Sequence, residues 1–452
     1  MTETSLAIII LAAGQSSRMK SNRTKVLHNL AGRSLLAHVL ATAKTLSPAR
    51  QVIVTSPGIE EEIAAAFPDA TVVVQSPALG SAHAVLAARE ALADFDGRIL
   101  VLYGDNPLLL PDTMRGMLDA LAADDKAALT VTGFRPADTT GYGRLLLNDA
   151  GELERIVEYR DANADELAVR LCNAGFMAFA PGVMFDLLDK IGNDNAKGEF
   201  YLTDAIELAC ADGDRCRAIE CTADEAIGVD NRERLAAAEL AIQKRLRARI
   251  LAGGTTLVDP LTTWLSFDTE LGRDVLVEPS VFFGPGVRVE RDVTIKAFSH
   301  LENCHIASGA VIGPYARIRP GTEIGEDARI GNFVEVKNAS IEAGAKANHL
   351  SYVGDARVGA GANLGAGTIT CNYDGFLKSH TDIGVGAFVG SNSALVAPVK
   401  IGDGAIIGAG STITKDVSTD AIAVERAEQV ERTGLAAAYR KRKQAEKDKR
   451  KK

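Results

Sequence analysis

The sequence predicts an α/β protein that combines an N-terminal domain of alternating strands and helices with a C-terminal parallel β-helix. Three observations carry this prediction. Short apolar runs alternate with helical patterns up to about residue 230, an uninterrupted helix former follows at 231–254, and a six-residue repeat appears beyond about residue 275. The domains are expected at residues 1–229 and 255–437, with a linking helix at 230–254 and a basic tail at 438–452.

The first half is expected to contain a parallel sheet that is covered on both faces. Its apolar runs are continuous in Val, Ile and Leu, which is typical of strands buried on both sides. We expect strands at residues 6–11, 51–55, 71–74, 98–104 and 128–134, and helices at 34–46, 80–92 and 111–124. Because ligands bind such sheets at the carboxyl ends of the strands, the loops after 6–11 and 98–104 form the first candidate site.

The loop after the first strand, within "IIILAAGQSSRMKSNRTK", has the composition of an anion-binding site. An apolar run ends at Gly14, and Arg18, Lys20, Arg23 and Lys25 follow. With a single glycine, the stretch is neither G-x-G-x-x-G nor a Walker A loop. Backbone N–H groups after Gly14 can hold phosphate, and Arg18 and Lys25 can offset its negative charge. A solvated surface cation is the alternative for either basic residue taken alone.

A carboxylate, Asp105, follows the strand at 98–104. Mg²⁺ is bound through one or two carboxylates, with water and substrate phosphates as further ligands. We therefore expect Asp105 to bind Mg²⁺, although a turn or helix-capping role before Pro107 is the alternative on bare sequence.

The second half repeats with a period of six. Units such as "IGPYAR", "VGAGAN" and "IGDGAI" open with an aliphatic residue, usually followed by Gly, and most carry a small residue at the fifth place. In a parallel β-helix three such units close one coil, with the aliphatic residue inward and the Gly permitting the corner. About twenty units, or six to seven coils, are expected between Val281 and Val417. The repeat is broken from about Cys371 to Asp382, which predicts a loop that protrudes from one face.

Composition narrows the class of protein. Of the 452 residues 46% are hydrophobic and 24% charged, and the net charge of −9 argues against a nucleic-acid binder. No apolar run approaches the ~20 residues of a membrane span, and the start lacks the features of a signal peptide. Six cysteines without metal-site spacing are expected to be reduced thiols in a cytoplasmic protein. The basic tail "YRKRKQAEKDKRKK" is expected to be solvated and disordered.

Several motifs together resemble one family. "LAAGQSSRM" followed by Lys25 resembles the signature of sugar-phosphate nucleotidyltransferases. With "LYGDNPLL", "TGYGR", "CNAGFM" and "GVDNR" in the first half, and "RIRPGT", "GNFVEVKNA", "KANHLSYVGDA" and "NLGAGTITCNYDG" in the second, nearly the whole chain is similar to the bacterial bifunctional N-acetylglucosamine-1-phosphate uridyltransferases and glucosamine-1-phosphate N-acetyltransferases.

The resemblance implies a Rossmann-like nucleotidyltransferase domain, a left-handed β-helix and a homotrimer whose acetyl-transfer sites lie between subunits. It implies small-molecule substrates only, namely glucosamine 1-phosphate, acetyl-CoA, N-acetylglucosamine 1-phosphate and UTP. Acetylation would come first and uridylyl transfer second. The product, UDP-N-acetylglucosamine, would be a precursor of peptidoglycan and outer-envelope polysaccharides.

For the uridyltransferase site, the resemblance implies two binding sets beside the catalytic Arg18 and Lys25. The nucleotide would contact Leu11, Ala12, Ala13, Gly14, Lys25, Gln75, Gly80, Ser81, Gly104 and Asp105, and the sugar would contact Tyr103, Gly143, Glu158 and Asn173. The second Mg²⁺ ligand would be Asp230, where the family has Asn. We therefore hypothesise that two carboxylates bind Mg²⁺ more tightly here.

For the acetyltransferase site, the chemistry requires a base that takes a proton from the substrate ammonium, and histidine suits this near neutral pH. His349 is the candidate because Arg319 and Lys337, two cations suited to a sugar phosphate, lie on nearby coils. A satisfied surface histidine is the alternative. The resemblance adds Tyr352 and Asn363 for glucosamine phosphate, and Ala366, Asn372, Tyr373, Ser391, Ala409 and Arg426 for acetyl-CoA.

Two points stay open at this stage. The chain could be a single-activity sugar nucleotidyltransferase whose β-helix serves only for oligomerisation. In addition, Ser16 stands where the family usually has glycine, so this residue either has an ordinary φ or contributes a hydroxyl contact to phosphate.

Overall fold

The computed structural model describes residues 4–14, 17–195 and 197–450. It divides into two compact units, Met1–Ala248 and Arg249–Lys452. Ser16 lies outside the described residues, so the two alternatives for its conformation stay open.

The first unit is built on a mixed sheet with the strand order β11-β7-β10-β6-β1-β4-β5. Its strands are β1 (Leu6–Ala12), β4 (Arg50–Thr55), β5 (Thr71–Val74), β6 (Arg98–Tyr103), β7 (Ala127–Phe134), β8 (Arg144–Leu147), β9 (Leu153–Val157), β10 (Cys172–Phe179) and β11 (Arg215–Glu220), besides the small hairpin β2 (Asn29–Leu30) and β3 (Arg33–Ser34). The five predicted strands are confirmed. These five strands run parallel to one another, as expected, and the sheet is mixed because an additional strand, β10, runs antiparallel to both β6 and β7.

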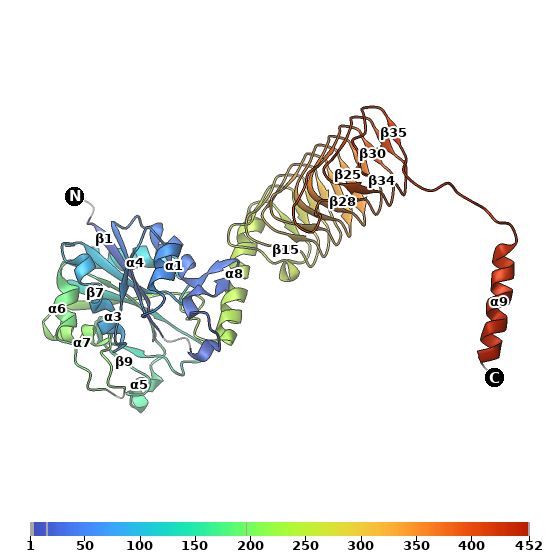
Figure 1. Ribbon diagram of the computed structural model, residues 1–452. Coiled ribbons are helices and arrows are strands. Elements are labelled where there is room, and N and C mark those ends of the chain that lie inside the picture. Colours follow the sequence, from blue (N-terminus) through green and yellow to red (C-terminus); the bar gives the residue numbers. More distant parts are fainter. Residues whose placement is uncertain (1–3, 15–16, 196, 451–452) are drawn as a thin grey trace. The chain divides into compact units, whose positions relative to one another are not determined.

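Helices cover both faces of this sheet (Figure 1). They are α1 (Leu35–Lys44), α2 (Glu60–Ala66), α3 (Ser81–Leu86), α4 (Pro111–Ala122), α5 (Ala164–Ala168), α6 (Val183–Leu188) and α7 (Asp204–Ala211), with 3-10 turns at Ser17–Met19, Lys25–Leu27 and Glu90–Leu92. Strand β1 shows why its run is continuous: Ile9 and Leu11 face one core, while Ile8 and Ile10 face the other. The helix predicted at 80–92 is shorter, because the N–H groups of Ala88 and Arg89 donate to residues three earlier and tighten the chain into 3-10 turns.

Helix α8 (Arg232–Ala252) follows the first unit's last strand, and the boundary between the two units falls inside it. Asn231 caps its first turn by accepting a hydrogen bond from the N–H of Arg234. Ala238, Ile242 and Leu246 are buried along one side of the helix.

The second unit is a solenoid of parallel strands (Figure 1). One side of it comprises β12 (Thr256–Leu257), β14 (Leu276–Val277), β17 (Thr294–Ile295), β20 (Val311–Ile312), β23 (Arg329–Asn332), β25 (Lys346–His349), β27 (Asn363–Leu364), β30 (Phe388–Val389), β33 (Ile406–Ile407) and β35 (Ile422–Ala423). The other strands are β13 (Glu270–Leu271), β15 (Phe282–Phe283), β16 (Val287–Val289), β18 (His300–Leu301), β19 (Cys304–Ile306), β21 (Arg317–Ile318), β22 (Thr322–Ile324), β24 (Glu335–Ile341), β26 (Tyr352–Val358), β28 (Ile369–Cys371), β29 (Thr381–Ile383), β31 (Ala394–Val396), β32 (Val399–Ile401) and β34 (Thr412–Ile413). The parallel β-helix is confirmed, and its coils extend on both sides of the predicted 281–417.

The solenoid interior follows the predicted pattern. The aliphatic residues Ile312 and Ile330 and the small residues Ala328 and Ala345 are fully or almost fully buried. The glycines that follow the aliphatic residues have a different role from the predicted one. A Cβ on Gly325 would lie 2.8 Å from the backbone nitrogen of Ala343 on the next coil, so these glycines allow the coils to stack closely.

The basic tail differs from its predicted disorder. Residues Leu435–Arg450 form helix α9, which buries none of its residues. Its Ala, Lys, Arg and Gln residues are good helix formers, and a Lys443–Glu446 ion pair lies along the helix. Helix propensity rather than packing therefore accounts for this segment.

Candidate active sites

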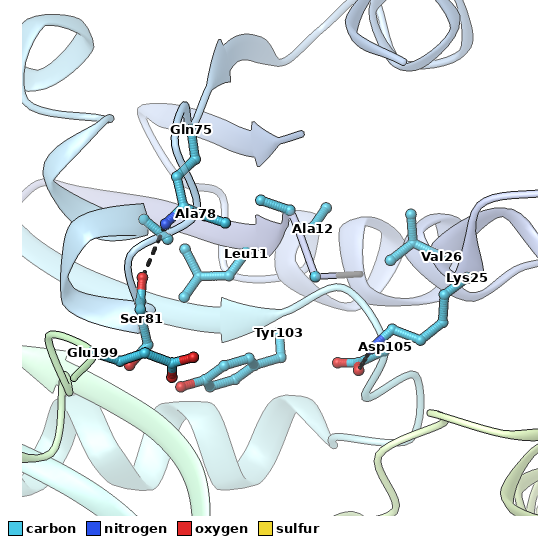
Figure 2. A pocket seen from close by; sticks show the side chains of 14 residues that line it. Leu11, Ala12, Lys25, Val26, Gln75, Ala78, Ser81, Tyr103, Asp105 and Glu199 are labelled. Carbon is cyan, nitrogen blue, oxygen red and sulfur yellow. Dashed lines mark hydrogen bonds and ion pairs between the residues drawn. The ribbon is translucent and has the colours of Figure 1, made fainter. Parts of the chain in front are cut away.

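The carboxyl ends of β1, β5 and β6 surround a cavity of about 430 Å³, called the first cavity here. It is lined by Leu11, Ala12, Ala13, Gly14, Lys25, Val26, Gln75, Ala78, Gly80, Ser81, Ala84, Tyr103, Asp105 and Glu199. Figure 2 shows Gln75 and Ser81 at one end of this cavity and Lys25 with Asp105 at the other, with Tyr103 between them. Of the predicted nucleotide contacts, Gly104 alone does not line it.

The Gln75 end of the first cavity is held rigidly. The Gln75 Nε2 donates to the Gly80 carbonyl at 3.0 Å, and the Ser81 hydroxyl oxygen accepts from the N–H of Leu202 at 2.9 Å. Gly80 has a φ of 115°, and a Cβ there would lie 2.7 Å from the backbone nitrogen of Phe200. Glycine is therefore required at this turn.

The predicted cations and metal ligands form two ion pairs. The Lys25 ammonium contacts the Asp105 carboxylate, and both side chains are largely buried. The Arg18 guanidinium lies 2.7 Å from the Asp230 carboxylate, with side-chain exposures of 71% and 24%. The predicted phosphate-binding cations and the predicted metal ligands are thus paired with each other in this structure.

A second cavity of about 440 Å³ adjoins the first and shares Lys25, Tyr103 and Asp105 with it. Its lining also contains Arg18, Asn106, Thr140, Gly141, Tyr142, Asn173, Ala174, Gly175, Ala226, Gly228, Asp230 and Arg234. The Asn173 Oδ1 accepts from the N–H of Gly175 at 2.8 Å, which fixes the amide at the cavity wall.

Three predicted residues lie outside the lining of both cavities. Gly104 is packed against Leu36 and Val26 beneath the first cavity. Gly143 and Glu158 lie together, since a Cβ on Gly143 would be 3.5 Å from the Glu158 Oε1. Burial raises the pKa of the Glu158 carboxyl above its ordinary value.

Asp105 and Asp230 fit a cation that is completed by substrate and water. The Asp230 Oδ1 is buried and has no hydrogen-bond partner among the described residues, whereas its Oδ2 contacts Arg18. In the part of the chain that the structure describes, no group of three or more His, Cys, Asp or Glu could hold a metal by itself. Two carboxylates with room for phosphate and water ligands match the coordination habit of Mg²⁺.

On the solenoid, four predicted residues form one column along an edge. The His349 carbonyl accepts from the N–H of Gly367, the Ala366 carbonyl from Asn392 and the Ser391 carbonyl from Gly410, so these positions repeat from coil to coil. The column ends at Ala409, whose carbonyl accepts from the Arg426 guanidinium at 2.7 Å. The structure thus brings His349 into line with residues predicted for acetyl-CoA.

His349 is exposed and has a defined orientation. Its Nδ1 lies 2.8 Å from the Oδ1 of Asn332, which occupies the same position one coil earlier. Because an amide oxygen only accepts, the Nδ1–H group is the donor to Asn332, and Nε2 is the ring nitrogen that this contact leaves for a substrate.

A group of cations on the solenoid gathers at the inserted loop. Lys378 of the inserted loop and then Arg319 lower the pKa of the Lys337 ammonium below its ordinary value. Asp355 lies close to both lysines, and the side-chain amides of Asn338 and Asn372 donate to its carboxylate. Several like charges held close together suit a multiply charged anion.

The remaining predicted residues are placed as follows. Tyr352 begins β26, in register with Glu335 and Ile369. Asn363 begins β27, in register with Lys346. Tyr373 lies in the inserted loop, and its hydroxyl donates to the Gly375 carbonyl at 2.6 Å.

Sequence reasoning did not select Asn332, Lys378, Glu199 or Arg234. Asn332 lies 17 residues before His349 and is in register with it on the preceding coil. Three units of about six residues predict a step of about 18, so the repeat alone does not point to Asn332. Lys378 lies inside the interruption of the repeat, where no periodicity guides the choice.

Comparisons with known proteins identify the family. The chain matches a MobA-like NTP transferase domain at residues 8–169 and bacterial transferase hexapeptide repeats at 303–338 and 380–415. A relative from Paramagnetospirillum magneticum, named bifunctional protein GlmU, is 52% identical and aligns over 99% of this chain and 100% of its own. This chain belongs to the GlmU family.

Further GlmU relatives agree with this assignment. Those of Azorhizobium caulinodans and Rhodospirillum rubrum are 56% and 55% identical, each over 97% of this chain and 98% of their own. The predicted family resemblance, the nucleotidyltransferase domain and the hexapeptide transferase domain are confirmed, and the hexapeptide family match is consistent with left-handed winding. No helix in the described ranges has the length and apolar character needed to cross a membrane.

Proposed function

We propose that this GlmU-family protein makes UDP-N-acetylglucosamine by two transfer reactions at separate sites. The solenoid edge at His349 acetylates glucosamine 1-phosphate with acetyl-CoA. The two cavities of the first unit then transfer UMP from UTP to N-acetylglucosamine 1-phosphate, with release of pyrophosphate. Near-full-length similarity to relatives named as bifunctional carries the proposal. The six free cysteines support the expected reducing, cytoplasmic compartment.

In uridylyl transfer, an oxygen of the sugar phosphate attacks the α-phosphorus of UTP and pyrophosphate leaves. The first cavity would hold UTP, with uracil against the fixed amide of Gln75 and the phosphates near Gly14. Lys25 and Arg18 would bind the phosphates and offset the charge that develops on the leaving group. Asp105 and Asp230 would hold Mg²⁺, which supplies further charge neutralisation when bound.

In acetyl transfer, the amine nitrogen of glucosamine 1-phosphate attacks the thioester carbon of acetyl-CoA, and the thiolate of coenzyme A leaves. The Nε2 of His349 would take the proton from the substrate ammonium, while Asn332 holds the ring. Arg319, Lys337 and Lys378 would bind the sugar phosphate. The column from Ala366 to Ala409, with its small side chains, lets a long ligand lie against the backbone.

We also propose that the protein is a homotrimer that covers the edge beside His349. Phe298, Tyr315, Phe333 and Leu350 follow one another from coil to coil along a corner, and each is about half exposed or more, at 53%, 47%, 56% and 60%. The three rings are stacked, with centroids 4.8 and 5.1 Å apart.

This row of bulky corner residues is called the aromatic ladder here. Its members have φ values of 50–61°, a conformation that costs roughly 1–2 kcal/mol per residue for side chains other than glycine. Asp, Asn and Gly fill almost all of the other left-handed corners of the solenoid, as at Asp292 and Asp327, and Ser280 is the exception. A ladder that uses strained backbone to expose large apolar side chains is typical of an interface.

A coupled assay tests the two activities. Glucosamine 1-phosphate, acetyl-CoA and UTP together should give UDP-N-acetylglucosamine, and omission of any one should abolish it. His349→Ala should lose acetyl transfer and keep uridylyl transfer, while Lys25→Ala should show the reverse. Absence of acetyl transfer in the wild type would leave only a nucleotidyltransferase.

Analytical ultracentrifugation tests the trimer. Phe333→Asp should dissociate it and reduce acetyl transfer while uridylyl transfer persists. Leu147→Asp, which alters an exposed apolar residue of β8 in the first unit, is the matched control and should remain trimeric. A wild-type monomer, or a trimer that survives Phe333→Asp, would contradict the assignment of the aromatic ladder.

A further inference from the structure

The second cavity contains a guanidinium group whose charge is not balanced by an ion pair. Arg234 lies in the first turn of α8 and lines this cavity, and it does not line the first. Among the described residues its guanidinium makes no ion pair, and its only hydrogen bond goes to the Tyr142 hydroxyl, at 2.8 Å. A guanidinium has five N–H donors, so most of its hydrogen-bonding capacity remains for a ligand.

The other two cations of this cavity differ from Arg234. Lys25 contacts Asp105, and Arg18 contacts Asp230. Lys25 and Asp105 also line the first cavity, which is the proposed triphosphate site, and Asp105 and Asp230 are the proposed metal ligands. Asp230 is close enough to act electrostatically on Arg234 but makes no ion pair with it.

Arg234 is held in position by neutral groups. Its guanidinium carbon lies 5.6 Å from the centroid of the Tyr142 ring, and that ring packs edge-on against Phe134 at 4.9 Å. Phe134 is buried, and Asn231 fixes the backbone of Arg234 at the start of the helix. The guanidinium is therefore preorganised at the cavity wall without being neutralised, which favours anion binding.

The geometry points to Arg234 as the residue that binds the phosphate of the sugar 1-phosphate acceptor in the second cavity. This inference rests on the proposed uridylyl transfer and names a further positioning residue for it. The second cavity contains Asn173, a predicted sugar contact, whereas Gln75 and Ser81 line only the first. An anion bound between Asn173 and Arg234 would therefore be the phosphate of the acceptor, and Arg234 would orient it toward the α-phosphorus of UTP.

Steady-state kinetics of Arg234→Gln tests the inference. Loss of a charge-assisted bidentate contact should raise the KM for N-acetylglucosamine 1-phosphate about ten-fold or more. The KM for UTP, and the KM for pyrophosphate in the reverse reaction, should change less than two-fold. Arg234→Lys should recover part of the loss, and Tyr142→Phe should raise the same KM a few-fold because the guanidinium is no longer fixed.

Lys244→Gln is the matched control, since it removes one positive charge from an exposed position of the same helix and should leave every constant unchanged. Acetyl transfer and the melting temperature report whether Arg234→Gln folds. A KM for the sugar phosphate equal to that of the wild type, or an equal rise for UTP or pyrophosphate, overturns the role of Arg234.

Direct titration with N-acetylglucosamine 1-phosphate separates this result from failure of the proposed function. If the wild type turns over and Arg234→Gln binds the sugar phosphate as tightly, only the inference fails. If the wild type neither turns over nor binds the sugar phosphate, the proposed function fails, and the role of Arg234 fails with it.

Discussion

The hydrogen bond between His349 and Asn332 gives the sharpest prediction for acetyl transfer. Asn332→Ala removes the acceptor that lies 2.8 Å from the Nδ1 of His349. A neutral hydrogen bond contributes about 0.5–1.5 kcal/mol, but the bond becomes charge-assisted when the ring takes a proton, and such bonds contribute about 1.5–3 kcal/mol. We therefore expect kcat/KM for acetyl transfer to fall about ten- to hundred-fold, with uridylyl transfer unchanged.

The assay follows release of the coenzyme A thiol at saturating acetyl-CoA, with pyrophosphate release from UTP as the internal control. Asn332→Asp keeps an acceptor and adds a charge that stabilises the imidazolium. It should therefore move the acidic limb of the pH–rate profile to higher pH. An unchanged kcat/KM in Asn332→Ala would refute the reasoning, because the ring would then be oriented without Asn332.

Three further outcomes are expected. Burial and then Glu207 raise the pKa of the Asp204 carboxyl to about 6, so the folded state favours its protonated form, and stability is lost as the pH rises through that value. Urea unfolding should therefore show that Asp204→Asn stabilises the protein by about 1–2 kcal/mol at pH 8 and by little at pH 4. Lys378→Ala should raise the KM for glucosamine 1-phosphate several-fold without changing that for acetyl-CoA. A chain ending at Gly434 should retain both activities and its melting temperature, because α9 buries no residue.

The parallel strands of the sheet were predictable, but the antiparallel strand β10 was not. The continuous apolar runs at β1 and β6 are consequences of burial on both faces, so they are visible in the sequence. The strand β10 (Cys172–Phe179) carries Asn173 and Gly175 among its apolar residues, and it runs antiparallel to β6. Burial fixes hydrophobicity, whereas strand direction depends on how the chain crosses over, which no local pattern records.

The solenoid was predictable because its period is local, and its site was only partly so. Inward Ile and Ala residues recur within each coil, whereas the columns that build the site join residues one coil apart. Those steps vary, with 17 residues from Asn332 to His349 and an inserted loop between Asn363 and Phe388. Residues that act through a neighbouring coil, such as Asn332, therefore had no signal of their own.

The carboxylate at Asp230 allows one more test of how charge is arranged in the uridyltransferase site. Arg18 contacts Asp230, but it is 71% exposed, so the pair contributes little, about 1 kcal/mol or less. Lys25 and Asp105 are both largely buried, so that pair is the stronger restraint. In Asp230→Asn, the proposed carboxylate ligand of Mg²⁺ is lost and Arg18 is released.

Two opposite effects should follow from this substitution. The apparent affinity for Mg²⁺, from titration of activity and of binding by calorimetry, should fall because one anionic ligand is gone. Affinity for UTP without metal should rise slightly, because Arg18 no longer has to leave a carboxylate before it meets phosphate. Equal Mg²⁺ affinities in the wild type and in Asp230→Asn would show that Asp230 contributes no more to metal binding than an amide does. Weaker UTP binding without metal would show that the ion pair with Asp230 positions Arg18 for phosphate instead of holding it back.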